Sequence, residues 1–292
     1  MIPVAPILVT GAGGKTGTAV LRALIARGAR VRAFARSGRH AAALRALGAH
    51  DVHVGAMDDR AAVARAVAGA AAIYHICPNV SPHEQDFARA MLAAARDAGV
   101  TRVVYHSVLH PQIEAMPHHW QKMRVEELLL EAGLDLTILQ PTAYMQNLLA
   151  GWPEIAGAGI HRVPYPAATR LSLVDLDDVA EAAARVLTEP GHGGATYELV
   201  GTSPLSQTEV AEILAGALGR PVRVEAEPLE RWAERAAAAG LNPHARETLA
   251  AMFRHYARHG LVGNPRLLTG LLGRPPTTLA GFARRAASGP VL

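Results

Sequence analysis

Apolar residues recur with two different periods along the first half of the chain. Short apolar runs predict buried strands, and the stretches between them repeat apolar residues with the helical period and end at glycine. The predicted strands begin at Ile7 and continue at 31–35, 51–54, 70–76, 102–107 and 135–139, with helices at 18–25, 41–47, 59–68, 84–98 and 120–132. This alternation is typical of the α/β class with a doubly wound parallel sheet. Ligands of such sheets bind above the carboxyl ends of the strands.

The pattern becomes less regular after Pro141. Residues 151–170 are rich in glycine and proline, which predicts a loop that leaves the sheet. Further strands are expected at 170–174, 196–200 (the last of the sheet) and 222–225, with helices at 175–187, 207–218, 228–239 and 244–259. We therefore predict a sheet domain at 1–148, continued by 171–203, and a smaller, mostly helical C-terminal substrate lobe made of 149–170 and 204–292.

The first strand is followed directly by a glycine-rich turn and a helix. Glycines stand at positions 11, 14 and 17, and Lys15 and Thr16 lie between the last two. The unpaired N–H groups at a helix start and the positive end of its dipole favour an anion. Gly11 permits the tight turn, Gly14 lets a pyrophosphate approach the backbone, and Gly17 lets the helix pack close to the sheet. The G-x-x-G-x-x-G spacing departs from G-x-G-x-x-G, yet its place between strand and helix predicts a dinucleotide site.

Composition narrows the class of protein. The chain has 292 residues, of which half are hydrophobic, enough for a large core. Its net charge is +4, but the basic residues are scattered, so no nucleic-acid partner is expected. The single cysteine, Cys77, fits a reducing compartment, and no apolar run reaches membrane-spanning length. We expect a cytoplasmic monomer or homodimer that acts on a small molecule, with neither a membrane nor a nucleic acid as partner.

The residue after the second predicted strand indicates which dinucleotide binds. Sites for NAD usually have an Asp or Glu there, which accepts a hydrogen bond from the ribose 2′-hydroxyl. This chain has Arg36, followed by Ser37. An arginine pairs with a 2′-phosphate, and Lys15 can add a second cation. We therefore predict NADP(H) as cofactor, with Arg36 and Ser37 among its ligands; the alternative is that Arg36 is an ordinary surface residue.

Loops after other strands complete the predicted cofactor site. Met57 and Asp58 follow the third strand, where such folds hold the adenine ring, although Asp58 or Asp59 would equally serve as a helix N-cap. The pyrophosphate and nicotinamide ribose are expected beside Ile76, Cys77, Pro78, Asn79 and, after the sixth strand, Pro141. A nucleophilic role for Cys77 is not expected, because no basic neighbour in the sequence would lower its pKa.

Candidate catalytic residues follow the fifth strand. Short-chain dehydrogenases have a serine there and Tyr-x-x-x-Lys on the next helix, where the lysine holds the nicotinamide ribose and the tyrosine donates a proton as hydride arrives. This chain has Ser107 and Lys122, but His118 stands where the tyrosine would be. Residues four apart share a helix face, so His118 is a candidate general acid. Alternatively, His118 caps the helix start or packs beside Trp120.

Several motifs together resemble one known family. They are the glycine turn, Arg36, His118–Lys122, the Ile138–Asn147 segment, Asp177-Asp178-Val-Ala and the Gly-Arg-Pro-Pro at 273–276. In these motifs the chain resembles the NmrA-like branch of the atypical short-chain dehydrogenases, over about residues 5–285. The resemblance implies a Rossmann-type fold, NADP(H) at the glycine turn and Lys122 near the nicotinamide ribose. Family members without the catalytic tyrosine include quinone reductases, a triphenylmethane dye reductase and NADP-sensing regulators.

The expected substrate pocket combines flat apolar rings with a few polar groups, which suits a planar, conjugated substrate. Its predicted residues are Ser107, Leu109, Lys122, Tyr144, Asn147, Trp152, Phe253 and Tyr256, the last two on what we expect to be the last helix. Tyr144 is either a replacement proton donor or a ring that packs under the nicotinamide.

The sequence thus predicts an NADPH-dependent oxidoreductase that transfers hydride to a small electrophilic, aromatic or quinone-like substrate. Its candidate catalytic residues are Lys122, His118, Ser107 and Tyr144. Two alternatives remain open, namely an NADP(H)-sensing regulator that binds a partner protein and a redox-neutral lyase or isomerase. No metal is expected, because His118 and His119 are adjacent and no H-E-x-x-H motif occurs.

Overall fold

The computed structural model of the chain describes residues 4–78 and 80–289, which form two compact units. The first unit comprises Met1–Gln112, Gln121–Gln140 and Val179–Tyr197, and the second comprises Ile113–Trp120, Pro141–Asp178 and Glu198–Leu292. The domain limits expected from the sequence remain a prediction.

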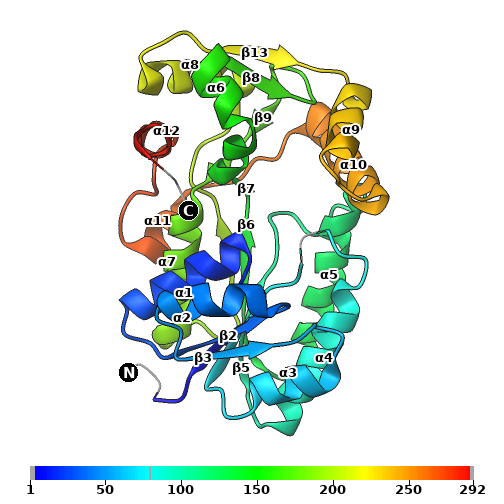
Figure 1. Ribbon diagram of the computed structural model, residues 1–292, viewed down its shortest axis with the longest axis vertical. Coiled ribbons are helices and arrows are strands. Elements are labelled where there is room, and N and C mark those ends of the chain that lie inside the picture. Colours follow the sequence, from blue (N-terminus) through cyan, green and yellow to red (C-terminus); the bar gives the residue numbers. More distant parts are fainter. Residues whose placement is uncertain (1–3, 79, 290–292) are drawn as a thin grey trace. The chain divides into compact units, whose positions relative to one another are not determined.

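A seven-stranded sheet is the main feature of the first unit (Figure 1). Its strands are β1 (Ile7–Val9), β2 (Val31–Ala35), β3 (Asp51–Val54), β4 (Ala72–His75), β5 (Arg102–His106), β6 (Asp135–Pro141) and β11 (Thr196–Leu199). They lie in the order β11-β6-β5-β4-β1-β2-β3, and every neighbouring pair from β3 to β6 is parallel. The predicted doubly wound α/β class is confirmed.

Helices cover both faces of this sheet (Figure 1). One face carries α1 (Lys15–Ala26), α2 (Ala41–Ala46) and α7 (Leu176–Thr188), and the other carries α3 (Arg60–Val67), α4 (Glu84–Asp97) and α5 (Pro117–Leu130). The apolar positions of α3, α4 and α5 form one core with the strands, in which Met91, Val125 and Ile138 are nearly inaccessible. Each such burial contributes about 1.5–3 kcal/mol, which holds α4 and α5 firmly against the strand ends.

The strand order reverses between β1 and β4, which creates the crevice where ligands of such sheets bind. Thr10 ties the two sides of this crevice together. Its Oγ1 donates to the Ile76 carbonyl at 3.0 Å and accepts from the Ile76 N–H at 2.8 Å. A Cβ on Gly11 would lie 3.0 Å from the Ile76 side chain, so a larger residue would push the two loops apart.

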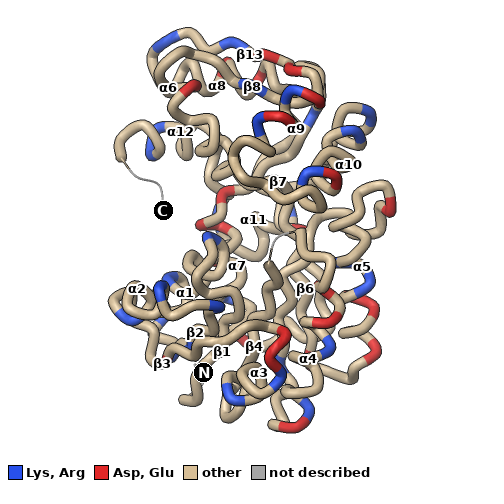
Figure 2. Tube along the Cα trace, turned by 45° about the vertical axis from the view of Figure 1, so that its right-hand side comes forward, with Lys and Arg blue, Asp and Glu red and all other residues tan. Residues whose placement is uncertain are grey.

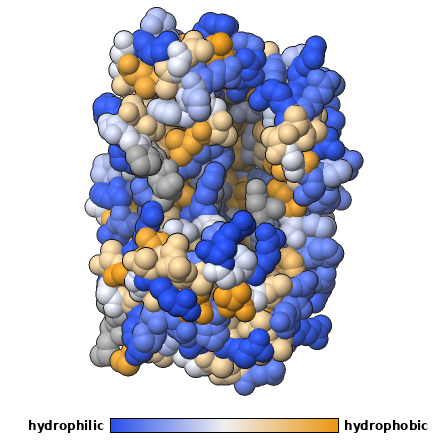
Figure 3. Space-filling view, in the orientation of Figure 1, coloured by the Kyte–Doolittle hydropathy of each residue, from blue (hydrophilic) through white to orange (hydrophobic). Residues whose placement is uncertain are grey.

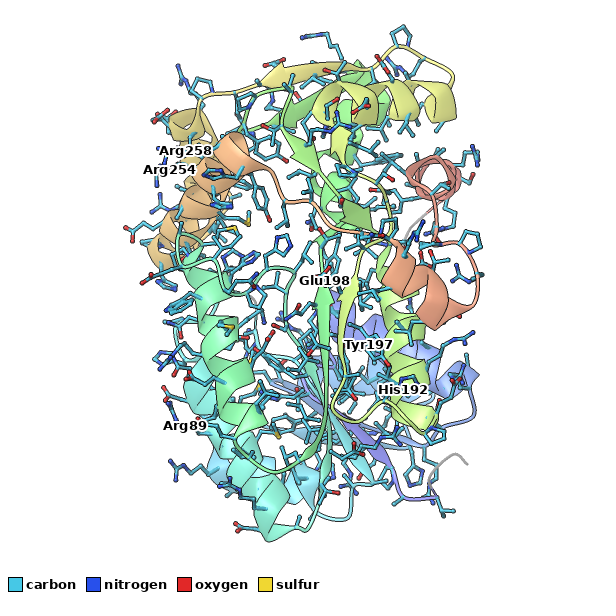
Figure 4. The ribbon with its side chains drawn as sticks, turned by 180° about the vertical axis from the view of Figure 1, so that it is seen from behind. Arg89, His192, Tyr197, Glu198, Arg254 and Arg258 are labelled. Atoms are coloured by element: carbon cyan, nitrogen blue, oxygen red, sulfur yellow. The ribbon has the colours of Figure 1, made fainter. Side chains whose placement is uncertain are left out.

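The edge strand β11 is anchored by side chains. His192 and Tyr197 point toward each other in Figure 4, with 2.9 Å between His192 Nδ1 and the Tyr197 hydroxyl. Thr137 Oγ1 donates to the His192 carbonyl at 2.8 Å, which fixes the turn before β11 against β6. The prediction that the strand near 196–200 belongs to this sheet is confirmed.

The second unit is built from short strands and several helices. Its strands are β7 (Ala143–Tyr144), β8 (Ile160–Val163), β9 (Arg170–Leu171), β10 (Leu173–Val174), β12 (Leu205–Ser206) and β13 (Arg223–Ala226). Its helices are η2 (Met145–Gly151), α6 (Trp152–Ala158), α8 (Gln207–Leu218), α9 (Leu229–Ala238), α10 (Pro243–His259), α11 (Arg266–Leu272) and α12 (Leu279–Ser288). These strands pair two by two, as β10 with β7, β12 with β9 and β13 with β8.

Three expectations for this part of the chain were wrong. The region 151–170 is not a plain loop but contains α6 and β8, because Pro153 lies in the first turn of α6 and Gly159, at φ 67°, ends it. The strand expected at 170–174 is two short strands with different partners. The helix that carries Phe253 and Tyr256 is not the last, since α11 and α12 follow it.

None of the described helices is both long and apolar enough to cross a membrane. On the face seen in Figure 3, hydrophobic residues form small groups among polar ones. Exposed large apolar side chains are few among the described residues; Leu130 and Val54 are examples.

Candidate active site

The glycine-rich turn opens the first helix without any side-chain cap. Gly14 is the N-cap residue of α1, and its N–H donates to the Gly11 carbonyl at 3.0 Å. No side chain caps this end, and no acidic residue lies in the first turn, all of which the structure describes. The first N–H groups of the helix are therefore available to an anion.

Gly11 has the tight-turn conformation expected of it, whereas the close contacts of Gly17 are with the entry loop of the helix rather than with the sheet. Gly11 has φ +59°, a conformation that favours glycine. A Cβ on Gly17 would lie 2.3 Å from the Gly11 carbonyl oxygen and 2.8 Å from Ala12 Cα, so only glycine allows α1 to pack against its own entry loop. This uncapped, side-chain-free cradle fits the pyrophosphate of a dinucleotide.

The positive charges expected beside this cradle are exposed. Lys15 and Arg36 are both solvent-exposed, and Ser37 is half-buried at the start of the short helix η1 (Gly38–His40). Residues 1–50 contain no Asp or Glu, and Figure 2 shows only basic charges on α1 and α2. A segment that contributes basic but no acidic side chains raises the local positive potential, which suits an anionic ligand.

The structure distinguishes between the two aspartates after β3. Asp59 is the N-cap of α3, and its carboxylate accepts from the Ala62 N–H at 3.0 Å. Asp58 is exposed and does not serve as the cap, and Met57 packs on the edge of the core. Asp58 therefore keeps its predicted role toward the adenine ring as a candidate.

Cys77 is buried just after β4, and burial raises the pKa of its thiol, with the Glu84 carboxylate as the second cause. A nucleophilic thiolate is not favoured in this position, in keeping with the low expectation from the sequence. Ile76 is half-buried and Pro78 is exposed beside it, whereas Asn79 lies outside the described residues. Pro141 is buried at the end of β6.

Lys122 lies in a buried polar cluster at the carboxyl end of β5. Its Nζ is 2.6 Å from Glu84 Oε1 and 3.3 Å from the His106 carbonyl oxygen. The Tyr105 hydroxyl donates to the same Glu84 oxygen at 3.0 Å. The Lys122 side chain is 14% exposed and that of Glu84 2%, so the ammonium group is fixed by a carboxylate behind it. Burial, and then the Glu84 charge, raises the pKa of Tyr105.

Two histidines beside Lys122 are neutral. Burial, followed by the Lys122 charge, lowers the pKa of both His75 and His106 to about 3. His106 Nδ1 is hydrogen-bonded to the Tyr74 hydroxyl. His75 Nε2 lies 3.5 Å from Cys77 Sγ, while its buried Nδ1 has no hydrogen-bond partner among the described residues.

Ser107 follows β5 directly and is almost fully buried. Its hydroxyl donates to Glu126 Oε1, and Gln140 Nε2 donates to both oxygens of the same carboxyl at 2.9 and 3.1 Å. Burial raises the pKa of Glu126 despite its contacts with Ser107, Gln140 and Lys122, which act the other way. Leu109, two residues after Ser107, is fully buried.

This cluster also contains Glu84, Glu126 and Gln140, which were not predicted from the sequence. A signal existed for Glu126, because it stands four residues after Lys122 and so shares its helix face. Glu84 gave no such signal, since an acidic residue in a first helical turn is usually a solvated dipole partner. Only the packing of α4 against α5 brings its carboxyl to Lys122.

The other candidates belong to the second unit. His118 is half-buried in the first turn of α5, edge-on to His119 with 4.5 Å between ring centroids. That turn starts at Pro117, three residues before the expected helix start. Tyr144 is half-buried in β7, and Asn147 is exposed on η2.

The structure brings some predicted substrate residues of this unit together and separates others. Phe253 and Tyr256 form an aromatic cluster with Tyr165 and Trp232, in which the Trp232 and Phe253 rings are 4.8 Å apart. Trp152 instead lies edge-on to Phe282 of α12 at 6.5 Å, a contact that serves packing. Among the described residues, no three His, Cys, Asp or Glu side chains gather into a potential metal site.

Comparison with known proteins gives consistent matches along the chain. The model of the NmrA-like family matches residues 4–273. The chain is 31% identical to an NAD(P)H azoreductase of Xenophilus azovorans, over 97% of this chain and 98% of that protein. It is 29% identical to quinone oxidoreductase 2 of Escherichia coli (strain K12), over 94% and 96% of the two chains.

A solved structure agrees with these matches. The crystal structure of an NADPH-dependent quinone oxidoreductase from Escherichia coli, complexed with NADPH, has a TM-score of 0.85 and 28% identity, and covers 96% of this chain and 99% of that one. The predicted family and fold are therefore confirmed. The chain belongs to the NmrA-like family and, as predicted, is an NAD(P)H-dependent oxidoreductase with a Rossmann-type fold.

Proposed function

We propose that this protein is an NADPH-dependent reductase of small, planar, electrophilic acceptors of the quinone or aromatic azo type. The observation that carries this proposal is the pair of features at the ends of β1 and β5. An uncapped helix start with no acidic residue in its first turn suits the anionic part of the cofactor, and a cation held by a buried carboxylate suits its ribose.

In this proposal the backbone of Gly11–Gly17 and Thr16 holds the pyrophosphate, and Lys15, Arg36 and Ser37 hold the 2′-phosphate. Met57 and Asp58 flank the adenine ring, and Ile76–Pro78, Pro141 and Lys122 line the nicotinamide end. When bound, NADPH supplies a hydride. Lys122 orients the ribose hydroxyls, because Glu84 holds its ammonium group in a single position.

The side chain at position 118 indicates which class of acceptor the protein reduces. His118 replaces the tyrosine that would donate a proton to a plain ketone. Strongly electrophilic acceptors depend less on an acid during hydride arrival, and their flat rings suit Tyr144, Phe253 and Tyr256, with Asn147 and Leu109 as further contacts. Trp152 is left out of this set, because it packs on Phe282 instead. The azoreductase and the quinone oxidoreductase among the relatives support this class.

The test is oxidation of NADPH and of NADH, followed by absorbance, with a naphthoquinone, a benzoquinone, an aromatic azo dye and cyclohexanone. We expect turnover with NADPH and at least one quinone or azo dye, and at least tenfold less with cyclohexanone or with NADH. NADPH binding without turnover of any acceptor would overturn the proposal and favour the sensing role. Conversion of a substrate without net NADPH consumption would favour the lyase or isomerase.

A further inference from the structure

A buried carboxyl stands directly behind the serine at the end of β5. The Ser107 hydroxyl contacts Glu126 Oε1, and Gln140 Nε2 holds both Glu126 oxygens at 2.9 and 3.1 Å. Ser107 is 2% exposed and Glu126 6%, so bulk water reaches neither freely. The three residues come from β6, α5 and the loop after β5, and all belong to the first unit.

The geometry of this group is fixed from several directions. The Ser107 N–H donates to the Leu139 carbonyl at 2.8 Å, which sets the serine at the carboxyl edge of the sheet. Gln140 lies on β6, the neighbouring strand, and the Nε2 group of its amide donates to the Glu126 carboxyl. Glu126 sits one helical turn after Lys122. The hydroxyl is therefore held against the Glu126 carboxyl, at the carboxyl edge of the sheet, where ligands of such folds bind.

Burial also changes the chemistry of the carboxyl. It raises the pKa of Glu126, so the acid form persists to higher pH than in an exposed glutamate. A protonated Glu126 can donate to Ser107 Oγ, which leaves the serine hydroxyl proton free to point away from the carboxyl. The two groups then form a chain in which each can pass on one proton.

We propose that Glu126, acting through Ser107, supplies the proton that the absent tyrosine would otherwise donate. This inference rests on the proposed reductase function. Glu126 is thus a positioning residue that holds a proton next to the serine, and Gln140 keeps the Glu126 carboxyl in place through two hydrogen bonds.

With a quinone as acceptor, the step transfers one hydride and one proton. The hydride given up by NADPH forms an O–H bond at one quinone oxygen, the ring π electrons move onto the opposite oxygen, and that oxygen takes the proton of the Ser107 hydroxyl as its O–H bond breaks. Ser107 takes a proton from the Glu126 carboxyl, which becomes a carboxylate. After the hydroquinone has left, water that enters beside Ser107 returns one proton through the serine hydroxyl to Glu126. The net change is NADPH, one proton and quinone to NADP+ and hydroquinone.

The matched pair of variants is Glu126→Gln and Glu127→Gln. Both remove one carboxylate from consecutive positions of α5, but Glu127 is about half exposed and pairs with Arg124 at the surface. With a quinone, kcat of the wild type should fall as pH rises through the raised pKa of Glu126, because only the protonated carboxyl can donate. Glu126→Gln should lower kcat at low pH about tenfold, a smaller loss than a ketone would suffer because a quinone depends less on an acid, and should remove this pH dependence, whereas Glu127→Gln should keep both.

A second acceptor separates proton delivery from hydride transfer. A cationic triarylmethane dye becomes colourless on taking a hydride and requires no proton. Glu126→Gln should therefore leave kcat for the dye within about threefold of the wild type. An equal loss of kcat with quinone and with dye would mean that the substitution disturbs the site as a whole. That result would overturn the proposed proton transfer from Glu126 through Ser107, called the relay below. An unchanged quinone pH profile in Glu126→Gln would overturn it as well.

A third readout does not depend on turnover. Infrared difference spectra recorded during a pH titration should contain a protonated-carboxyl band that is present in the wild type and Glu127→Gln and missing in Glu126→Gln. Titration of this band at the pH of an ordinary glutamate would overturn the relay even in a protein without reductase activity. Loss of all NADPH oxidation in the wild type, with this band in place, would instead count against the proposed function alone.

Discussion

The contact between Gly17 and Gly11 sets how closely α1 approaches the end of β1. Because a single methyl group on Gly17 would overlap the Gly11 carbonyl, the cradle has no room for adjustment. Arg36 acts at the same scale in a different way, since it is exposed and provides charge without supporting the fold. Gly17 therefore affects the shape of the site, whereas Arg36 is expected to affect its preference for one cofactor.

Replacing Gly17 with alanine should damage both stability and cofactor binding. The overlap of the new Cβ with backbone atoms costs about 1–3 kcal/mol, because α1 must move away from its loop. Gly216 in α8 is the control, since a Cβ there meets nothing within 4 Å and alanine favours helices. Denaturant unfolding and NADPH titration would check this, and equal behaviour of the two variants would contradict it.

Replacing Arg36 with aspartate should change cofactor preference rather than binding in general. We expect about 100-fold weaker binding of NADPH and almost unchanged binding of NADH, because only NADPH carries the 2′-phosphate. Arg22→Asp, an equal charge change at an exposed position of α1, should affect both cofactors little. Fluorescence titration of each cofactor measures this, and equal losses for the two would refute the role of Arg36.

At the scale of elements, buried carboxylates connect segments that are distant in sequence. In the second unit, Asp178 at the start of α7 accepts from the Thr277 N–H at 2.6 Å, from the Thr277 hydroxyl at 3.1 Å and from Arg274 at 2.7 Å. It thereby holds the Gly-Arg-Pro-Pro segment between α11 and α12. In the first unit, Glu84 does the same for α4 and α5 through Lys122.

Asp178→Ala should destabilise the protein by about 2–3 kcal/mol, because the Thr277 N–H loses its buried acceptor. Asp177→Ala is the neighbouring control, and its side chain is 57% exposed. That change should cost less than about 1 kcal/mol, mostly through the helix dipole. The free energy of unfolding in urea compares the two variants directly. A smaller loss of stability from Asp178→Ala than from Asp177→Ala would contradict the role of Asp178 in holding this segment.

At the scale of the whole molecule, stability should depend on pH through two buried histidines. His75 and His106 have pKa values of about 3 in the folded protein and about 6.5 when unfolded. Between these values the unfolded chain binds more protons, so stability is complete above about pH 6.5 and is lost as pH falls toward 3. Each histidine contributes a slope of about 1.4 kcal/mol per pH unit in this window.

The free energy of unfolding, measured from pH 7.5 to pH 4, tests this. Below pH 6.5, His75→Asn should reduce the slope of the unfolding free energy against pH by about 1.4 kcal/mol per pH unit, the contribution of one histidine. This holds whatever the substitution does to stability at neutral pH. His83→Asn should leave the slope as it is, because the His83 side chain is 66% exposed. An unchanged slope in His75→Asn would show that this residue is not buried in its neutral form.

Several strands and helices of both units could be predicted from the local pattern of apolar residues. The strands at Val31–Ala35 and Asp51–Val54 and the helix at Gln207–Leu218 have the limits that apolar periodicity predicted. The region 151–170 could not be read in this way, since Pro153 and Gly159 mark the ends of a helix as readily as they mark a loop. The roles of the individual site residues, Lys122 and Arg36 among them, stay predictions that the experiments above address.

The sequence by itself determined the order of strands and helices in the seven-stranded sheet unit, together with the glycine turn, because these depend on neighbours within a few positions. Only the tertiary structure decided which side chains surround Lys122 and Ser107. Glu84 lies 38 residues from Lys122 and Gln140 14 residues from Glu126, and packing on a shared sheet edge brings them into contact. Burial is a property of that packing, so the neutral histidines and the raised pKa of Glu126 could not be read from residue order.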